Sequence, residues 1–192
     1  MEKQRLHSSQ ANIFYIVILS FVLLFSNCNS IQAAEGRNPI EEIKIGILLH
    51  DVDGLWSGFK REKGTDINCA AIFKVKKRLL GGDLQPVLGA SVNTLGYTSK
   101  LYLDGVWHYD LTKSLYGTLG LGVALHNGER HLVSSDRKAL GSHLLFHLPL
   151  EIGYRFDSHL SFSIYFDHMS NGYILEENEG LDTLGFRVGY RF

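Results

Sequence analysis

Residues that could carry out nucleophilic catalysis lie near the C-terminal end of the sequence. His168 and Ser170 are separated by one residue, and the carboxylic acid Asp182 follows in the next segment. A serine hydroxyl is a weak nucleophile until a neighbouring base takes its proton, and a histidine with an ordinary pKa of about 6.5 does this near neutral pH. A carboxylate behind the histidine fixes its tautomer and stabilises the imidazolium that forms. These residue types predict an esterase site.

Each part of this candidate site also has a simpler interpretation. The pair His-x-Ser occurs often by chance, and the Asn-Gly that follows Ser170 favours a turn. Asp182 could be an ordinary acid at a loop edge. The NH₂ group of Asn178 is suited to stabilise a developing oxyanion. Three glutamates in the same loop are expected to be solvated, although each competes as the acid: Glu176, Glu177 and Glu179.

The segments that carry these residues alternate apolar and polar side chains with period two, which is typical of β-strands. Even positions are apolar over residues 184–192 and over residues 160–166. Alternate residues of a strand point to the same side, so His168 and Ser170 continue one apolar row and Asp182 ends the other. The two strands form a hairpin, and we therefore expect the three polar residues to meet.

Six further segments alternate in the same way, so the sequence predicts eight strands. The six are residues 43–52, 66–76, 84–93, 99–109, 115–125 and 144–156. Short and long connections alternate along the chain, as in barrels with short periplasmic turns and long external loops. The expected short connections are residues 78–83, 110–113 and 156–159. The expected external loops are residues 53–64, 127–138 and 171–181, with a shorter one at 94–98.

One face of these strands is uniformly large and apolar, whereas the other mixes charged residues, histidines, serines and many glycines. A soluble barrel would place its apolar residues inside and its polar residues outside. An eight-stranded barrel has little interior room, which suits small and polar side chains. We therefore predict an all-β fold, an eight-stranded antiparallel transmembrane β-barrel whose apolar face contacts lipid. The charged residues expected to pair in its lumen are Glu151, Arg155, Arg187 and Arg191.

Strand geometry gives the expected height of the candidate site. Nine steps separate His159 from His168, which is about 30 Å along a strand at ~3.3 Å per residue. With a tilt of ~40°, this row rises about 23 Å, and the ten steps from Phe192 to Asp182 rise about 25 Å. The apolar band of such barrels is ~25 Å tall. The site is therefore expected on the outside wall, at the level of the ester linkages of the outer leaflet.

The first 34 residues are expected to be a cleavable signal peptide. Basic residues precede an apolar run over residues 13–25, and a small-residue segment then ends at Ala34. The run is short for a membrane-spanning helix. Two alternatives stay open, an uncleaved N-terminal anchor and a lipoprotein attached at Cys28, which lacks a good lipobox. The barrel domain is predicted over residues 35–192.

Composition excludes several other classes of protein. The chain has 19 Lys+Arg against 20 Asp+Glu and no basic stripe, so nucleic acid is not an expected partner. Cys69 is the only cysteine after the leader, so no intrachain disulfide is expected there, and it is expected to fill space in a strand. No spacing typical of metal ligands occurs. The other histidines are expected in the lumen or at strand edges, among them His50, His108, His143 and His147.

Several consecutive motifs at the C-terminal end carry a family resemblance. They are FDHMSNGY at residues 166–173, NEGLDTLGF at 178–186 and YRF at 190–192, preceded by LPLEIGYRF at 148–156. Together they resemble the lipid A 3-O-deacylases of the PagL type. That family has His-x-Ser-Asn on the penultimate strand, then an Asn-x-Gly-x-acid element and a final alternating strand. The specific match covers residues 148–192, and the N-terminal half agrees in architecture.

The resemblance implies a role for each candidate residue. His168 would be the base, Ser170 the nucleophile and Asp182 the orienting acid. Asn178 would match the oxyanion-hole residue of the family, and Asn171 the asparagine beside the serine. The family usually has Glu where this chain has Asp182, whose side chain is one methylene shorter. Aspartate serves in other triads, so we expect it to substitute here.

The implied reaction is hydrolysis of a 3-hydroxyacyl ester of the lipid A part of lipopolysaccharide. Water would resolve the acyl-enzyme, and no metal or organic cofactor is implied. The expected location is the outer membrane of a Gram-negative cell, with lipopolysaccharide and outer-membrane lipids as partners and a homodimer left open. Two rival functions remain: a non-catalytic eight-stranded barrel with a structural or adhesive role, and an esterase that acts on phospholipids.

Overall fold

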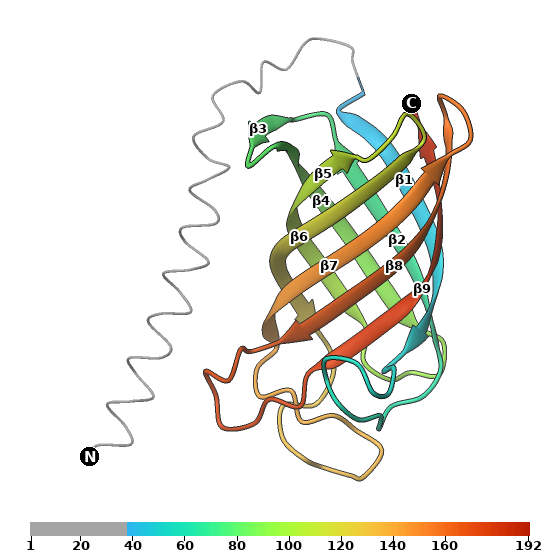
Figure 1. Cartoon of the computed structure of the whole chain (residues 1–192). Helices are drawn as coiled ribbons and strands as arrows, with labels where there is room; N and C mark the ends of the chain where they lie inside the picture. The colour runs from blue at the N-terminus through green and yellow to red at the C-terminus, as the bar shows by residue number, and fades with distance from the viewer. Residues whose placement is uncertain (1–37) are drawn as a thin grey trace.

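The computed structural model describes residues 38–192, so the predicted signal peptide and the alternative lipid attachment at Cys28 lie outside the described residues. No helix in the described part is long and apolar enough to cross a membrane. The chain there forms nine β-strands (Figure 1). They are β1 (Ile40–His50), β2 (Thr65–Phe73), β3 (Lys77–Leu79), β4 (Gly82–Asn93), β5 (Lys100–Asp110), β6 (Leu115–His126), β7 (Leu144–Arg155), β8 (Leu160–Ser170) and β9 (Leu181–Arg191).

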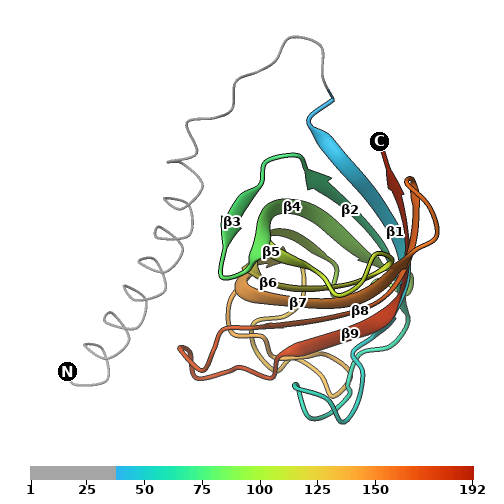
Figure 2. The same ribbon diagram turned by 45° about the horizontal axis from the view of Figure 1, so that its top comes forward.

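Eight of these strands close into a barrel, which Figure 2 shows turned toward one end. Strand β1 pairs with both β2 and β9, and β2 also pairs with β4, so the ring has no free edge. All pairs are antiparallel. The predicted eight-stranded antiparallel barrel is confirmed, with the ends of the strands shifted by a few residues.

Strand β3 is an additional element where the sequence predicted only a short turn. It pairs with the start of β4 in a small hairpin. The two turn residues, Leu80 and Gly81, have φ angles of 53° and 80°. Two-residue hairpin turns with positive φ at both positions usually carry Asn-Gly or Gly-Gly. Leucine seldom adopts this conformation, so the sequence indicated a short turn here but not a two-residue hairpin with its own strand β3.

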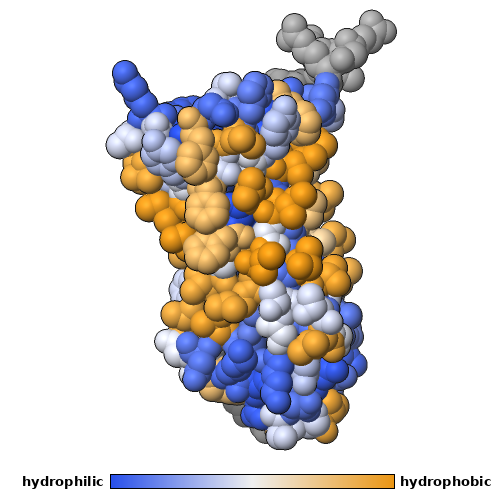
Figure 3. Space-filling model, turned by 90° about the vertical axis from the view of Figure 1, so that its right-hand side faces the viewer, coloured by the Kyte–Doolittle hydropathy of each residue, from blue (hydrophilic) through white to orange (hydrophobic). Residues whose placement is uncertain are grey.

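The outer wall is apolar and the lumen is polar, as predicted. On the face drawn in Figure 3, hydrophobic residues gather across the middle of the barrel, and the two ends are mostly hydrophilic. Exposed apolar residues alternate with buried residues along β1, β8 and β9. Cys69 is exposed on β2, so it does not fill a buried space. A closed sheet suits a bilayer because each backbone polar group finds its partner on a neighbouring strand.

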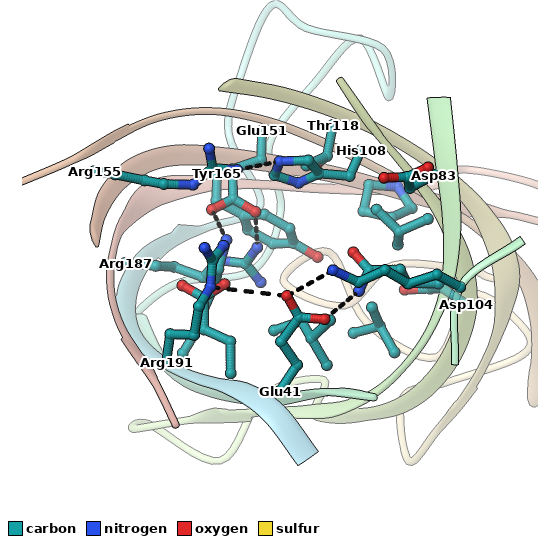
Figure 4. A pocket seen from close by; sticks show the side chains of 18 of the residues that line it. Glu41, Asp83, Asp104, His108, Thr118, Glu151, Arg155, Tyr165, Arg187 and Arg191 are labelled. Carbon is teal, nitrogen blue, oxygen red and sulfur yellow. Dashed lines mark hydrogen bonds and ion pairs between the residues drawn. The ribbon is translucent and has the colours of Figure 1, made fainter. Parts of the chain in front are cut away.

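Buried ion pairs link strands across the lumen. Glu151 of β7 accepts a hydrogen bond from Lys44 of β1 at 2.7 Å and pairs with Arg187 of β9 (Figure 4). These three side chains are nearly inaccessible to solvent. The predicted lumen positions of Glu151 and Arg187 are therefore confirmed, and Lys44 is a partner that the sequence did not identify.

The other two predicted lumen arginines pair near the end of the barrel that carries the short turns. Arg155 contacts Asp110 at 2.7 Å, and Arg191 lies 3.8 Å from Glu41. They surround a small hollow of about 140 Å³, shown in Figure 4. Both basic and acidic side chains line it, so the hollow is polar and carries charges of both signs.

A second group of buried charges fills the middle of the lumen. Lys100 of β5 pairs with Asp167 of β8. His147 of β7 lies 2.9 Å from Asp104 and 3.5 Å from Asp167. The predicted lumen position of His147 is confirmed. Together with the Glu151 pairs, this group occupies the interior with side chains, as the small radius of an eight-stranded barrel requires.

The four longest connections gather at the end of the barrel opposite the C-terminus (Figure 1). They are residues 51–64, 94–99, 127–143 and 171–180, which correspond to the predicted external loops. The connections between β5 and β6 and between β7 and β8 lie at the other end. The candidate residues are at the loop end, because β8 runs into residues 171–180 and β9 leaves them.

A buried carboxylate, Asp51, holds the loop between β1 and β2. Its Oδ2 accepts hydrogen bonds from the backbone N–H groups of Arg61 at 2.6 Å and Glu62 at 2.8 Å. Its Oδ1 lies 3.3 Å from the ammonium group of Lys138, in the loop between β6 and β7. Burial raises the pKa of Asp51 above its ordinary value, although these donors act in the opposite direction. Asp51 therefore joins two loops.

A second buried carboxylate, Glu62, brings in a third loop. It lies 3.0 Å from the imidazole of His50 and accepts the N–H of Thr98 at 2.9 Å and that of Lys138 at 3.1 Å. Burial alone would raise the pKa of Glu62, but the hydrogen bonds from these partners outweigh it and hold the pKa below its ordinary value. Asp51 and Glu62 together form what we call the loop clamp.

Replacing Glu151 with glutamine should destabilise the barrel. The change leaves the cations of Lys44 and Arg187 buried without a full countercharge, and breaking a buried ion pair costs about 3–5 kcal/mol. Denaturant unfolding of the protein in detergent micelles measures the free energy of unfolding. Glu176→Gln, at an exposed loop position, is the control. Equal unfolding curves for the two variants would contradict the importance of this ion pair.

Replacing Glu62 with alanine should loosen the loops and leave the barrel closed. The change removes the acceptor for His50, Thr98 and Lys138 together. We expect faster cleavage of the loops by a protease, with the gel mobility of the folded barrel retained in unheated samples. Glu129→Ala, at an exposed position of the loop between β6 and β7, serves as the control. Unchanged cleavage of Glu62→Ala would argue against the clamp.

Candidate active site

His168 and Asp182 face each other across the β8–β9 hairpin. They are cross-strand partners in the register of the sheet, so the predicted match in height is confirmed. His168 Nδ1 lies 2.6 Å from Asp182 Oδ1. An ionised carboxylate only accepts hydrogen bonds, so the histidine donates from Nδ1 and keeps Nε2 as an acceptor.

Ser170 completes a continuous chain of hydrogen bonds. It lies two residues after His168 on the same side of β8, and its hydroxyl donates to His168 Nε2 at 2.9 Å. The order is therefore carboxylate, imidazole and hydroxyl, in which a histidine can remove the proton of a serine. The shorter side chain of Asp182 reaches His168 because the two residues lie directly opposite each other.

The three residues are covered, although the sequence predicted a site open on the lipid-facing wall. His168 and Ser170 are each 8% exposed, and Asp182 is fully buried. Their positions continue the outward rows of β8 and β9, but the loops 51–64 and 171–180 fold over them. Excluding water from such a site strengthens the electrostatic interactions within it.

Two residues of the loop between β1 and β2 were missed by sequence reasoning. The backbone N–H of Ser57 donates to Asp182 Oδ2 at 2.7 Å. The ring centroid of Trp56 lies 5.0 Å from that of His168. Ser57 and Asp182 are 125 positions apart in the chain, and the loop lacks the alternation that located the strands. No local signal could therefore have placed it over the site.

The loop 171–180 packs tightly against the histidine. Gly180 has a φ of 63°, and a Cβ added there would lie 3.0 Å from Cε1 of His168. A side chain at this position would be strained in the backbone and would press on the imidazole. Glycine therefore lets the loop close over His168 without displacing it.

Asn178, the predicted oxyanion residue, lies in the loop 171–180. Its amide oxygen accepts the backbone N–H of Asn171 at 2.7 Å. This contact orients the amide, and no hydrogen bond from residues 38–192 occupies its NH₂ group. Asn178 lines the same hollow as Ser170. The wall of this hollow therefore contains a hydrogen-bond donor as well as the serine.

The side chain of Asn171 organises the surrounding loops. Its NH₂ group donates to the carbonyl of Leu140 at 3.2 Å and to that of Glu177 at 2.6 Å. Gly141, with a φ of 78°, allows this approach, because a Cβ there would lie 2.2 Å from the Glu177 carbonyl. Both amide hydrogens of Asn171 are thus used on backbone carbonyls, which makes it a support for the loop rather than a free donor.

The competing acids in the loop have other partners. Glu179 contacts Arg61 at 2.9 Å and accepts the backbone N–H of Ala139 at 2.8 Å. Glu177 lies 3.0 Å from His131. Neither is within the hydrogen-bond chain of Ser170, which reaches only Asp182. Within residues 38–192, no group of three or more His, Cys, Asp or Glu side chains could hold a metal ion.

Two hollows adjoin the candidate residues. One, of about 670 Å³, has Ser170 and His168 in its wall together with the aromatic residues Trp56, Phe59 and Tyr173. The other, of about 840 Å³, is an apolar groove on the outside of β1, β8 and β9, which includes Leu184, two residues after Asp182, and Phe186. The outer wall of the same strands can therefore receive an aliphatic chain.

Comparison with known proteins identifies the family and supports the fold. The model of the family described as lipid A 3-O-deacylase (PagL) matches residues 84–191. Among solved structures, the crystal structure of the outer membrane enzyme PagL has a TM-score of 0.56 at 17% identity, over 79% of this chain and 99% of that chain. The crystal structure of Neisserial surface protein A has a TM-score of 0.50 at 13% identity, over 82% of this chain and all of that one. No curated protein matches the sequence.

The structural likenesses have low sequence identity and therefore show the fold alone, a membrane-spanning barrel. The family match covers more than half of the chain and includes β4 to β9 with all the predicted site residues. It leaves out β1, β2 and the loop that carries Trp56 and Ser57. The chain thus belongs to the lipid A 3-O-deacylase (PagL) family of outer-membrane β-barrel hydrolases.

Proposed function

We propose that this chain hydrolyses the 3-O-linked 3-hydroxyacyl ester of lipid A, with Ser170 as nucleophile, His168 as general base and Asp182 as the orienting acid. The observation that carries the proposal is the hydrogen-bond chain from Asp182 through His168 to Ser170. It stands at the loop end of the apolar wall, where the ester linkages of the outer leaflet lie.

In the first step, Ser170 Oγ attacks the carbonyl carbon of the ester while its proton passes to His168 Nε2. The imidazolium that forms is stabilised by the carboxylate of Asp182 on the other ring nitrogen. When the tetrahedral intermediate collapses, the bond to the sugar oxygen breaks, and His168 returns the proton to that oxygen. The acyl chain is then esterified to Ser170.

Water resolves the acyl-enzyme in the second step. His168 takes a proton from the water as it attacks the acyl carbon, and it returns the proton to Ser170 Oγ as the fatty acid leaves. The reaction needs no metal or organic cofactor, because the serine, the histidine and water supply every proton and bond. The NH₂ group of Asn178 would stabilise the oxyanion in both steps.

The site fits a substrate that lies in the membrane. An acyl chain can lie in the groove beside Leu184 and Phe186 while its ester reaches Ser170. The buried charges of the lumen fill the interior, so access from the outer leaflet through the wall is favoured over access through the barrel. A homodimer stays a prediction, as do the catalytic roles of the individual residues.

Replacing Ser170 with alanine should abolish release of the acyl chain, since no nucleophile remains. Mass spectrometry of lipid A from cells that express either form measures the loss of one 3-hydroxyacyl group. Purified protein incubated with phospholipid vesicles, and separately with lipid A, identifies the ester that it prefers. Unmodified lipid A with the unaltered chain would favour the non-catalytic barrel, and hydrolysis of phospholipid alone would favour the phospholipid esterase.

Replacing Asp182 with asparagine should lower turnover by on the order of 10³–10⁴-fold, because the neutral amide favours the wrong tautomer of His168. The matched control is Glu179→Gln, which should leave turnover nearly unchanged, since glutamine can still accept the Ala139 N–H. The rate of acyl release from lipid A in detergent micelles compares the variants. A larger loss for Glu179→Gln would move the acid into the loop.

A further inference from the structure

The loop between β1 and β2 reaches the site from a part of the chain that the family match does not cover. Trp56 lies against His168 with 5.0 Å between the ring centroids and an angle of 38° between the rings. It also stacks on Phe166, two residues before the histidine on the same row, at 6.4 Å. The indole therefore packs against the imidazole at a tilt and continues the aromatic surface of β8.

The backbone around Trp56 is fixed rather than free. The N–H of Val52 donates to the carbonyl of Asp182 at 3.0 Å, and the N–H of Ser57 donates to its side-chain Oδ2 at 2.7 Å. The loop clamp of Asp51 and Glu62 holds the rest of the loop. Trp56 lies between Val52 and Ser57, and both of these residues are hydrogen-bonded to Asp182. Its position therefore depends on Asp182, the partner of His168.

The outer side of Trp56 faces the surroundings. The residue is 62% exposed, although one face of its ring is covered by His168. Tryptophan is enriched at membrane–water interfaces, where its ring contacts lipid and its N–H contacts water. The exposed part therefore suits the bilayer surface, and the covered part contacts the base of the reaction.

We propose that Trp56 is a positioning residue of the esterase, which holds His168 in line with Ser170 and stabilises the imidazolium that forms when the serine proton is transferred. This inference rests on the function proposed above. It adds to the site a residue from outside the family-matched segment. In this proposal Trp56 acts on His168, and binding of the lipid substrate is not its main role.

The physical reason is that the indole interacts more strongly with protonated His168 than with neutral His168. An aromatic face attracts a cation within about 6 Å of the ring centroid, and tryptophan does so best. His168 is neutral before proton transfer and positively charged during it, so the indole stabilises the charged state more. An interaction that is stronger in the transition state raises kcat, whereas uniform binding changes only KM.

Trp56→Leu tests the proposal because it keeps an apolar side chain and removes the aromatic face. We expect kcat for acyl release to fall roughly tenfold with little change in KM, and Trp56→Phe to retain most of the activity. Leu55→Ala, at the exposed neighbouring position of the same loop, is the control for a general disturbance of the loop and should behave like the unaltered chain.

A small fluorophosphonate probe distinguishes an effect of Trp56 on His168 from an effect of Trp56 on the binding of lipid A. It labels an activated serine without requiring contacts to lipid A, so the labelling rate of Ser170 reports on the base alone. We expect Trp56→Leu to slow labelling by the same factor as kcat. Labelling at the original rate with a raised KM for lipid A would overturn the proposal, because Trp56 would then only bind substrate.

Other outcomes are equally decisive. Equal losses in Trp56→Leu and Trp56→Phe would show a packing role and overturn the proposal, since phenylalanine keeps an aromatic face. The gel mobility of unheated protein confirms that each variant is a folded barrel. If the unaltered chain neither releases acyl chains nor reacts with the probe, the proposed function itself fails, and this result is distinct from a failure of Trp56 alone.

Discussion

The closure of the backbone hydrogen bonds is the constraint on which the rest of the structure depends. Lipid offers no partner for an N–H or C=O group, so each strand in the apolar band must be paired on both sides. This requirement pairs β8 with β9, and the apolar alternation of the two strands selects the register in which His168 lies opposite Asp182. The catalytic geometry is thus a consequence of sheet pairing at the end of a hairpin, where polar side chains no longer contact the lipid interior.

The same register explains how Asp182 can reach His168 although its side chain is shorter than the glutamate that is usual in the family. Directly opposite residues of an antiparallel pair have close side chains, so Asp182 meets His168 without the additional methylene of glutamate. One oxygen of Asp182 contacts the histidine, and the other accepts the N–H of Ser57. Because both oxygens are held, the short side chain has little freedom to turn away. The loop between β1 and β2 therefore compensates for length with an additional hydrogen bond.

Much of this arrangement could be predicted from period-two patterns, because alternation along a strand is local. The even-numbered row that leads to Ser170 placed the histidine and the serine together, and strand lengths gave the height of Asp182. The turn at Leu80 was expected, but the three-residue strand β3 before it was missed, since leucine is unusual with positive φ and the strand is too short to show alternation. The cover over the site was missed as well, because it depends on the long-range contacts of Trp56 and Ser57 and on buried loop carboxylates, which have no periodicity.

The covered site reconciles two requirements that oppose each other. A carboxylate, and a histidine that would become charged in the proposed reaction, need shelter from lipid, since an ionised group is costly within the apolar band. The proposed reaction also requires the ester of a membrane lipid to reach the serine. The loops shelter Asp182 completely and leave a small part of Ser170 accessible, and an apolar groove runs along the outside of β1 and β9. The charges of the lumen are paired among themselves and do not extend to this wall. Chemistry on the outside of a filled barrel is therefore consistent with a substrate that never leaves the membrane.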